Sequence, residues 1–205
     1  MNGNRIMTMA ALFLLTSAFP GWADVTLDGT MGPAGAVNGP DYDIRAEYGR
    51  QSGGNLFHSF GRFSVGAGER ATFSGPGSVS NIIGRVTGGD LSRIDGTLRS
   101  TISGADLFLL NPAGVIFGAG ASLDLTGAFH VGAADALNFS DGTSFNAVPA
   151  EGEILSAAPP SAFGFLDGGA DGEVRIEGDL SVPAGESLTV AGREVTVSGS
   201  LSAPD

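Results

Sequence analysis

Residues 173–183 read EVRIEGDLSVP and residues 194–204 read EVTVSGSLSAP, so the two stretches align without gaps at a spacing of 21 positions. The matched positions are Val174 with Val195, Ile176 with Val197, Gly178 with Gly199, Leu180 with Leu201 and Pro183 with Pro204. Alternation of apolar and polar residues puts the aliphatic side chains on one face of each short strand. A repeat of this length predicts a β-solenoid, in which successive coils stack in parallel and aligned side chains form the core.

The rest of the chain has the same character. Glycine supplies 34 of the 205 residues, and short runs of β-branched or aromatic residues alternate with Gly, Asn-Pro or Asp-Gly breaks. Almost every window long enough for a helix contains a glycine, which predicts an all-β protein. A β-sandwich is the alternative, but it has no reason to repeat residue identities across 21 positions. We therefore expect a parallel β-helix, a single-stranded solenoid of about 21 residues per coil.

The stretch ADLFLLNPAGVIFG at residues 105–118 is unusually apolar for this chain. Its two apolar runs, 107–110 and 115–117, are short and bounded by turn residues, which predicts two strands buried on both faces. Between them, Asn111 is suited to cap a turn through its side chain, Pro112 fixes φ, and Gly114 accepts an unusual φ. We interpret this turn as a structural corner that sets the path of the coil.

The first residues are typical of a Sec signal peptide. Arg5 is followed by an apolar stretch from Ile6 to Phe19, and small residues precede a cleavage position after Ala23. The apolar stretch is shorter than the roughly 20 residues that cross a bilayer as a helix. We therefore divide the chain into a cleaved signal, residues 1–23, and one domain, residues 24–205.

The mature domain is acidic and lacks cysteine and lysine. Removing the signal leaves nine arginines against 22 acidic residues, a formal net charge of −13. Such a charge argues against binding to nucleic acid or anionic membranes, which clustered cations favour. Without cysteine, stability depends on aliphatic and Phe burial and on backbone hydrogen bonds rather than on disulfides.

Three blocks of sequence together resemble one family. They are GGNLFHSFGRFSV at 53–65, NIIGRVTGGDLSRIDGTL at 81–98 and ADLFLLNPAGVIFGAGASLDLTGAFHVGAAD at 105–135. In this order they resemble the N-terminal secretion (TPS) domain of two-partner-secretion exoproteins of the filamentous-haemagglutinin type, also called the haemagglutination activity domain. The resemblance extends over essentially the whole of residues 24–205.

The resemblance implies a right-handed parallel β-helix with an N-terminal cap and extra-helical β-hairpins. It also implies a function in targeting without catalysis or cofactor. After export by the Sec machinery, the unfolded domain engages the periplasmic POTRA domains of an outer-membrane TpsB-type β-barrel transporter. It then nucleates folding of the following passenger at the cell surface, so the expected location is secreted or surface-bound, in a Gram-negative envelope.

The chain departs from the family at two places. The family turn commonly reads Asn-Pro-Asn-Gly, whereas Ala113 stands at the third position here. Family members also continue into a long passenger, whereas this sequence stops at Asp205 directly after the proline of a coil. A truncated gene product, a fragment and a stand-alone relic are the open interpretations, and we expect the last coil to be uncapped.

The candidate site residues fall into two sets. The secretion and turn motif comprises Asn111, Pro112 and Gly114, for which a structural role and direct transporter contact are both open. The candidate transporter-recognition segment comprises Asn55, Phe57, His58, Phe60, Asn81, Arg85 and Arg93. For Arg85 and Arg93, solvated strand faces with the aliphatic stems lying along apolar surface are the simplest interpretation.

Other kinds of site have weaker support. His58 and His130 are the only histidines, and neither has the nearby Cys or acidic pattern of a zinc or catalytic site. The stretch DGGADGE at 167–173 lacks the spacing of a calcium loop and predicts an Asp-Gly turn. We expect no metal, cofactor or bound small molecule.

Two alternative functions come from other classes. One is a surface adhesin that binds host or neighbouring-cell glycans, an activity that would belong to a missing passenger. The other is a polysaccharide-acting β-helix enzyme, which needs a groove with clustered carboxylates and cationic groups. The absence of lysine disfavours the enzyme.

Overall fold

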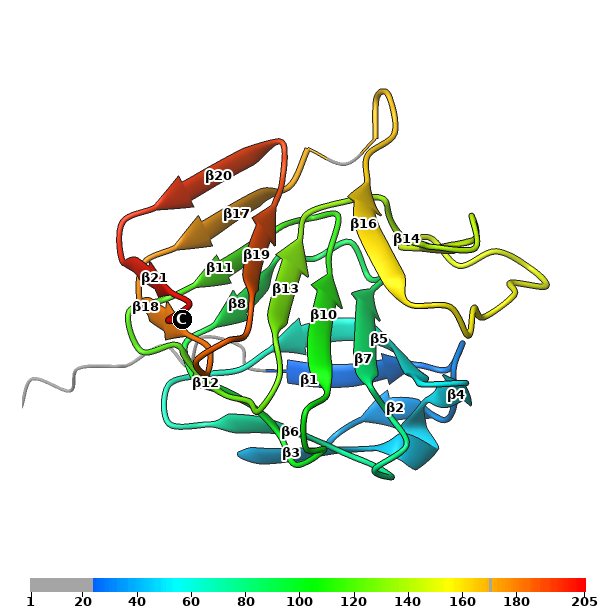
Figure 1. Cartoon of the computed structure of the whole chain (residues 1–205), viewed down its shortest axis with the longest axis horizontal. Helices are drawn as coiled ribbons and strands as arrows, with labels where there is room; N and C mark the ends of the chain where they lie inside the picture. The colour runs from blue at the N-terminus through cyan, green and yellow to red at the C-terminus, as the bar shows by residue number, and fades with distance from the viewer. Residues whose placement is uncertain (1–23, 170) are drawn as a thin grey trace, which may run out of the picture.

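The protein is all-β. The computed structural model describes residues 24–169 and 171–205, so the predicted signal peptide lies outside the described residues. The described chain forms five sheets, and its helical content is one short 3₁₀ turn, η1 (Ala46–Tyr48). Figure 1 shows three sets of strands stacked side by side, with a separate group of strands against one face.

The largest sheet has eight strands, and five of them are parallel. In spatial order it contains β19 (Leu188–Ala191), β13 (Phe129–Gly132), β10 (Asp106–Leu110), β7 (Asn81–Val86), β5 (Asn55–Ser64), β1 (Asp24–Asp28) and β2 (Ala34–Ala36), and β4 (Arg50–Ser52) also pairs with β5. β5, β7, β10, β13 and β19 are parallel to one another. We call this the eight-stranded sheet.

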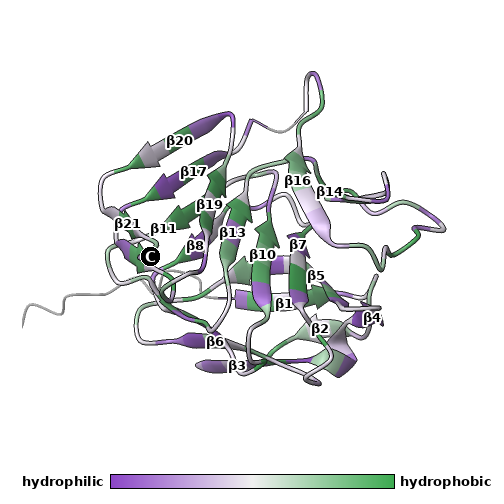
Figure 2. Ribbon diagram, in the orientation of Figure 1, coloured by the Kyte–Doolittle hydropathy of each residue, from purple (hydrophilic) through white to green (hydrophobic). Residues whose placement is uncertain are grey.

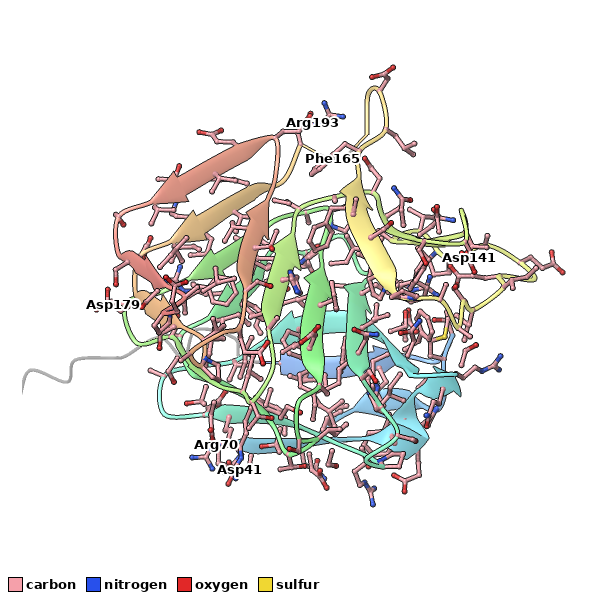
Figure 3. All side chains as sticks on the ribbon, viewed as in Figure 1. Asp41, Arg70, Asp141, Phe165, Asp179 and Arg193 are labelled. Carbon is pink, nitrogen blue, oxygen red and sulfur yellow. The ribbon has the colours of Figure 1, made fainter. Side chains whose placement is uncertain are left out.

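Two four-stranded sheets and one pair of strands are wholly parallel. The β8–β20 sheet contains β8 (Ser92–Ile94), β11 (Val115–Phe117), β17 (Glu173–Ile176) and β20 (Glu194–Val197). The β3–β12 sheet contains β3 (Asp41–Arg45), β6 (Arg70–Ser74), β9 (Thr97–Ser100) and β12 (Ser122–Asp124). The β18–β21 pair contains β18 (Asp179–Ser181) and β21 (Ser200–Ser202). In Figure 3, Asp41 and Arg70 mark the paired β3 and β6, and they form an ion pair of 3.6 Å.

The chain visits these sheets in a repeating order. From β7 to β13 it passes from the eight-stranded sheet to the β8–β20 sheet, then to the β3–β12 sheet, and back again. The residues between β13 and β17 leave this path, and we call them the excursion. After the excursion, β17 to β21 repeat the order, with the β18–β21 pair in place of the β3–β12 sheet. From β9 onward, each strand on this path therefore lies beside the equivalent strand of the preceding round, with β18 beside β12.

Paired positions carry similar side chains, which explains why the rounds stack. In the eight-stranded sheet the aligned inward row comprises Leu56, Ile82, Leu107, Phe129 and Leu188. The first four are buried in the main core, and Leu188 packs against it. Figure 2 shows the apolar colouring of the middle strands β10, β11 and β13 against the polar colouring of β3 and β6. Burial of such aligned rows is the main stabilising term of this architecture.

The predicted parallel pairing of the repeat is confirmed. Val174 pairs with Val195, and Ile176 with Val197, in one parallel ladder, and Leu180 pairs with Leu201 in another. The spacing of 21 positions is wrong for the earlier strands. Phe57 pairs with Ile83, 26 positions on, and Asp41 pairs with Arg70, 29 positions on. Longer turns between these strands account for the difference.

The excursion builds a separate sheet. Residues between β13 and β17 form β14 (Ala136–Phe139), β15 (Ser144–Asn146) and β16 (Pro160–Gly164), which pair antiparallel to one another. This outer sheet packs on the outward face of the eight-stranded sheet through a second apolar cluster. The cluster includes Phe57, whose ring centroid lies 5.0 Å from that of Phe145 and 5.9 Å from that of Phe139.

The N-terminal strands occupy one edge of the parallel ladder. β1 and β4 both pair antiparallel with β5, on the edge opposite β7. The backbone groups along this edge of β5 are therefore hydrogen-bonded within the protein instead of being open to another chain. The sequence predicted that the N-terminal segment would provide such a cover.

Candidate functional site

The turn between β10 and β11 is a buried corner between two sheets. β10 lies in the eight-stranded sheet and β11 in the β8–β20 sheet, and both predicted strands are confirmed. The amide of Gly114 donates to the carbonyl of Asn111 at 3.0 Å, and Gly114 has φ of +109°. A Cβ at Gly114 would lie 2.7 Å from the carbonyl oxygen of Glu173, so glycine is required by space as well as by φ.

Asn111 is fully buried and uses both ends of its carboxamide. Its Oδ1 accepts from the amide of Ala113 at 3.0 Å, which confirms the predicted cap of the turn. Its Nδ2 donates to the carbonyl of Asp90 at 3.0 Å and to Oγ of Ser92 at 2.9 Å. The side chain therefore ties the corner to the start of β8 in the preceding round.

The candidate recognition residues lie on β5, β7 and β8, and most are buried. Asn55 and Phe57 face outward from β5 toward the outer sheet, whereas His58 and Phe60 face the main core. Those four side chains and Arg85 are buried, Asn81 is half-buried, and Arg93 is exposed. The strand pairing brings Asn55 and Asn81 together, with a side-chain hydrogen bond of 2.8 Å.

Arg85 corrects the interpretation of a solvated strand face. Its side chain is 0% exposed, and its Nη1 lies 2.8 Å from both carboxylate oxygens of Glu153. Nη1 also donates to the carbonyl of Asn146 at 2.7 Å, and Nε donates to Oγ of Ser59 at 2.8 Å. The guanidinium carbon lies 4.2 Å from the ring centroid of Phe145. A buried cation needs such partners, because desolvation without them is costly.

Arg93 behaves as predicted. It is 52% exposed and forms an ion pair of 2.7 Å with Asp95 on the surface. The two arginines differ because Arg85 lies beneath the excursion between β13 and β17. Nothing local in the sequence distinguishes them.

Asp28 anchors a polar cluster beside Arg85. Its carboxylate accepts from the hydroxyls of Ser59, Thr87 and Thr30. Burial alone raises the pKa of Asp28, but the hydrogen bonds from Ser59, Thr30 and Thr87 outweigh it and hold the pKa below its ordinary value. Thr30 also accepts from Arg85 Nη2 at 3.2 Å, so the turn after β1 joins the same network.

His58 is buried without hydrogen bonds. Within the described part of the chain, neither ring nitrogen has a hydrogen-bonding partner. The ring packs against Phe60 and Phe73, with centroid distances of 6.0 and 5.8 Å. Burial lowers the pKa of His58 to about 4, so the side chain is neutral at physiological pH.

His130 lies half-buried at the mouth of a cavity of about 540 Å³. Its ring stacks on Phe108 with centroids 4.3 Å apart, and Phe163 and Phe165 of the β16 region line the same cavity. Figure 3 labels Phe165 beside β16. Burial lowers the pKa of His130, and the charge of Asp106 partly opposes this. His130 is thus a packed side chain of strand β13.

The described residues hold no group of three or more His, Cys, Asp or Glu side chains able to bind a metal. In the stretch at 167–173, Gly168 has φ of +70° and the amide of Gly169 donates to the carbonyl of Leu166, as expected for a turn. Across residues 24–169 and 171–205, no helix has the length and apolar character needed to cross a membrane.

Sequence reasoning missed Glu153, Asn146 and Ser59 as partners of Arg85. Glu153 lies 68 positions after Arg85, in a segment of irregular structure. The only feature of the sequence that points to Glu153 is that this carboxylate precedes the apolar pair Ile154 and Leu155. No short-range spacing connects those positions to β7.

Comparison with known proteins gives one family match. A model of the TPS secretion domain family matches residues 23–205. A search of curated proteins finds no match.

Proposed function

The chain belongs to the TPS secretion domain family, and from this premise we propose that its domain is recognised, while unfolded, by POTRA domains of a transporter and then nucleates folding at the cell surface. The family comprises targeting domains of two-partner-secretion exoproteins, which act without catalysis. Membership gives the chain a TpsB-type transporter as its partner and export across the outer membrane as its route.

We propose that the stacked rounds form a right-handed parallel β-helix. The repeating order of the three parallel ladders supports a coiled path, and the aligned inward row of the eight-stranded sheet supports stacking coil on coil. Each coil then offers a template of unpaired backbone groups to the next, so folding can proceed along the chain as it emerges. Folding of this kind needs neither nucleotide nor disulfide formation.

The burial of the candidate recognition residues supports recognition before folding. Asn55, Phe57, His58, Phe60 and Arg85 are buried in the folded domain. A transporter that reads their side chains must therefore meet them before folding is complete. The segments 53–65 and 81–98 supply aromatic and Arg side chains of the kind that anchor protein interfaces.

The single observation that carries the proposal is the family match over residues 23–205. Binding of the urea-unfolded chain, rapidly diluted, to the purified POTRA domains of its partner transporter tests the recognition step. We expect saturable binding of the unfolded chain and reduced binding when Phe57 and Phe60 are replaced by Ser. Equal binding of the unfolded chain and an unrelated acidic unfolded protein would contradict the proposal.

A further inference from the structure

Residues 147–159, which link β15 to β16, cross the outward face of β5 and β7 without forming a strand or helix. We call this segment the strap. Its carbonyl groups are held from below, because Asn55 Nδ2 donates to the carbonyls of Ser156 at 2.9 Å and Ala158 at 2.7 Å. Ser52 Oγ donates to the carbonyl of Leu155 at 2.9 Å. The strap is therefore fixed by side chains of β4 and β5.

The strap also seals the apolar cluster beneath the outer sheet. Leu155 and Ala158 pack against the cluster that contains Phe57 and Ile83. A Cβ at Gly53 would lie 2.9 Å from the Cβ of Ala157, so the strap lies directly against the turn between β4 and β5. The strap therefore covers Asn55 and Arg85, whereas Phe57 is covered by Phe139 and Phe145 of the outer sheet.

Glu153 is the ionic anchor of the strap. Its carboxylate lies 2.8 Å from Arg85 Nη1, and the two side chains are 8% and 0% exposed. The remaining partners of the Arg85 guanidinium come from Thr30, Ser59 and Asn146. Removing either partner of this buried ion pair leaves the charge of the other one buried without its counter-ion, which is strongly destabilising.

These partners become available only after most of the domain has been delivered. The Arg85 network joins the turn after β1, strand β5, the end of β15 and the strap, so Glu153 enters last in chain order. β5, β7 and β10 can pair before the strap arrives, because their ladder hydrogen bonds do not use it. The closing of the strap is thus separable from the pairing of the strands.

We propose that the strap is a closing device that removes Asn55 and Arg85, two of the candidate recognition residues, from reach once the domain has folded. With the strap closed, Asn55, Phe57 and Arg85 are buried and the folded domain is not taken up again. With the strap open, Asn55 and Arg85 lose the cover of the strap on an already paired sheet, while Phe57 stays beneath Phe139 and Phe145 of the outer sheet. The inference rests on the proposed function. It adds that the ion pair of Glu153 with Arg85 controls whether the strap is open or closed.

Two matched variants test the device in the full chain. Glu153→Gln removes the carboxylate that faces Arg85, whereas Glu151→Gln makes the same chemical change at an exposed position of the strap. Hydrogen–deuterium exchange reports opening without reference to the transporter. We expect amides of residues 147–159 to exchange about tenfold faster or more in Glu153→Gln, with β10 and β13 unchanged and Glu151→Gln equal to the natural sequence.

Binding to the purified POTRA domains then tests the consequence. The folded natural chain and folded Glu151→Gln should bind at least about tenfold more weakly than folded Glu153→Gln. Equal binding of all three folded proteins would overturn the device, and so would a strap that exchanges at the natural rate in Glu153→Gln.

A third variant and one control keep the test decisive. If Glu153→Gln does not fold, Ser52→Ala removes a single strap hydrogen bond and should produce the same changes with smaller size; no change would overturn the device. The unfolded natural chain is the control for the proposed function itself. If the unfolded natural chain binds the POTRA domains and no folded variant with an open strap does, the closing device is wrong and the proposed function stands. If the unfolded natural chain does not bind, the proposed function is wrong.

Discussion

The side-chain nitrogen of Asn111 donates a 2.9 Å hydrogen bond to the hydroxyl of Ser92, 19 positions earlier, and both side chains are buried. The bond joins the corner after β10 to the first residue of β8, which lies in the preceding round. A turn motif that looks local in the sequence thus fixes the stacking of two successive rounds.

Replacing Asn111 by Ala should destabilise the domain. The variant leaves the carbonyl of Asp90 and the amide of Ala113 without these partners inside the protein, which costs about 1–3 kcal/mol. The melting temperature should fall by roughly 2–4 °C for each kcal/mol in a domain of this size. Asn38→Ala, at an exposed position, serves as the control and should melt as the natural protein does.

The same variant separates the two roles considered for Asn111. If the residue acts only through the fold, export should fall in proportion to stability, and a second stabilising change should restore it. A natural melting curve combined with lost export would instead indicate that the transporter reads Asn111 directly.

His58 should make the domain less stable in acid. The unfolded chain takes up the histidine proton near pH 6.5, whereas burial lowers the pKa of folded His58 to about 4. Between these values the unfolded state binds more protons, so the free energy of unfolding falls as pH decreases, by about 1.4 kcal/mol per pH unit at most. This contribution is fully present above pH 6.5 and is lost as pH falls through 4.

Urea unfolding of the natural protein and of His58→Leu at several pH values between 4 and 7 measures this contribution. The difference between the two free energies should change with pH, because carboxylates affect both proteins equally. His130→Leu, at a half-buried site, should show a smaller difference. Parallel pH curves for the natural protein and His58→Leu would contradict the assignment.

Gly96 should be intolerant of any side chain. A Cβ at this corner would lie 2.4 Å from the carbonyl oxygens of both Glu69 and Gly66, which belong to the preceding round. Gly96→Ala must therefore push two backbone segments apart. It should lower the free energy of unfolding by about 3 kcal/mol, at the upper end of the usual range for a single substitution. Gly77→Ala, where a Cβ meets nothing within 4 Å, should cost less than about 0.5 kcal/mol.

Chemical unfolding of both glycine variants checks the stacking distance between rounds. Similar unfolding midpoints for Gly96→Ala and Gly77→Ala would show that the corners can separate without loss. The close approach at Gly96 would then not limit the architecture.

Truncation of Leu107, in the 105–118 stretch, should destabilise the domain. Leu107 lies in the inward row between Ile82 and Phe129 and is 1% exposed. Leu107→Ala removes three buried carbons and leaves a cavity, at a cost of about 2–5 kcal/mol. Leu166→Ala makes the same change at a residue that is 66% exposed and should change stability by less than about 0.5 kcal/mol. Equal losses in the two variants would contradict the assigned row.

Sequence periodicity was informative where neighbouring rounds use short turns. The pairing of Val174 with Val195 follows from one alignment, because nothing is inserted between those strands. The period of 21 failed among the earlier strands because their turns are longer, and between the paired Val115 and Val174 because the whole outer sheet separates them. An excursion of that kind interrupts a repeat without changing the residues that stack.

The polar part of the site was beyond sequence reasoning. Arg85 was expected to reach solvent, since strand alternation alone places it on an outer face. That face is covered by the strap, whose Glu153 is 68 positions away and belongs to no periodic element. The turn chemistry of Asn111 and Gly114 was predicted because their geometry depends on neighbours in sequence, whereas the bond to Ser92 depends on the fold.

The central claim is that this domain directs export through a partner transporter. The most direct test fuses a reporter enzyme after Asp205 and measures its activity in the medium, in cells with and without the partner transporter. The account predicts secreted reporter only when the transporter is present, and loss of secretion when residues 53–98 are deleted. Equal secretion in cells without the transporter would contradict it.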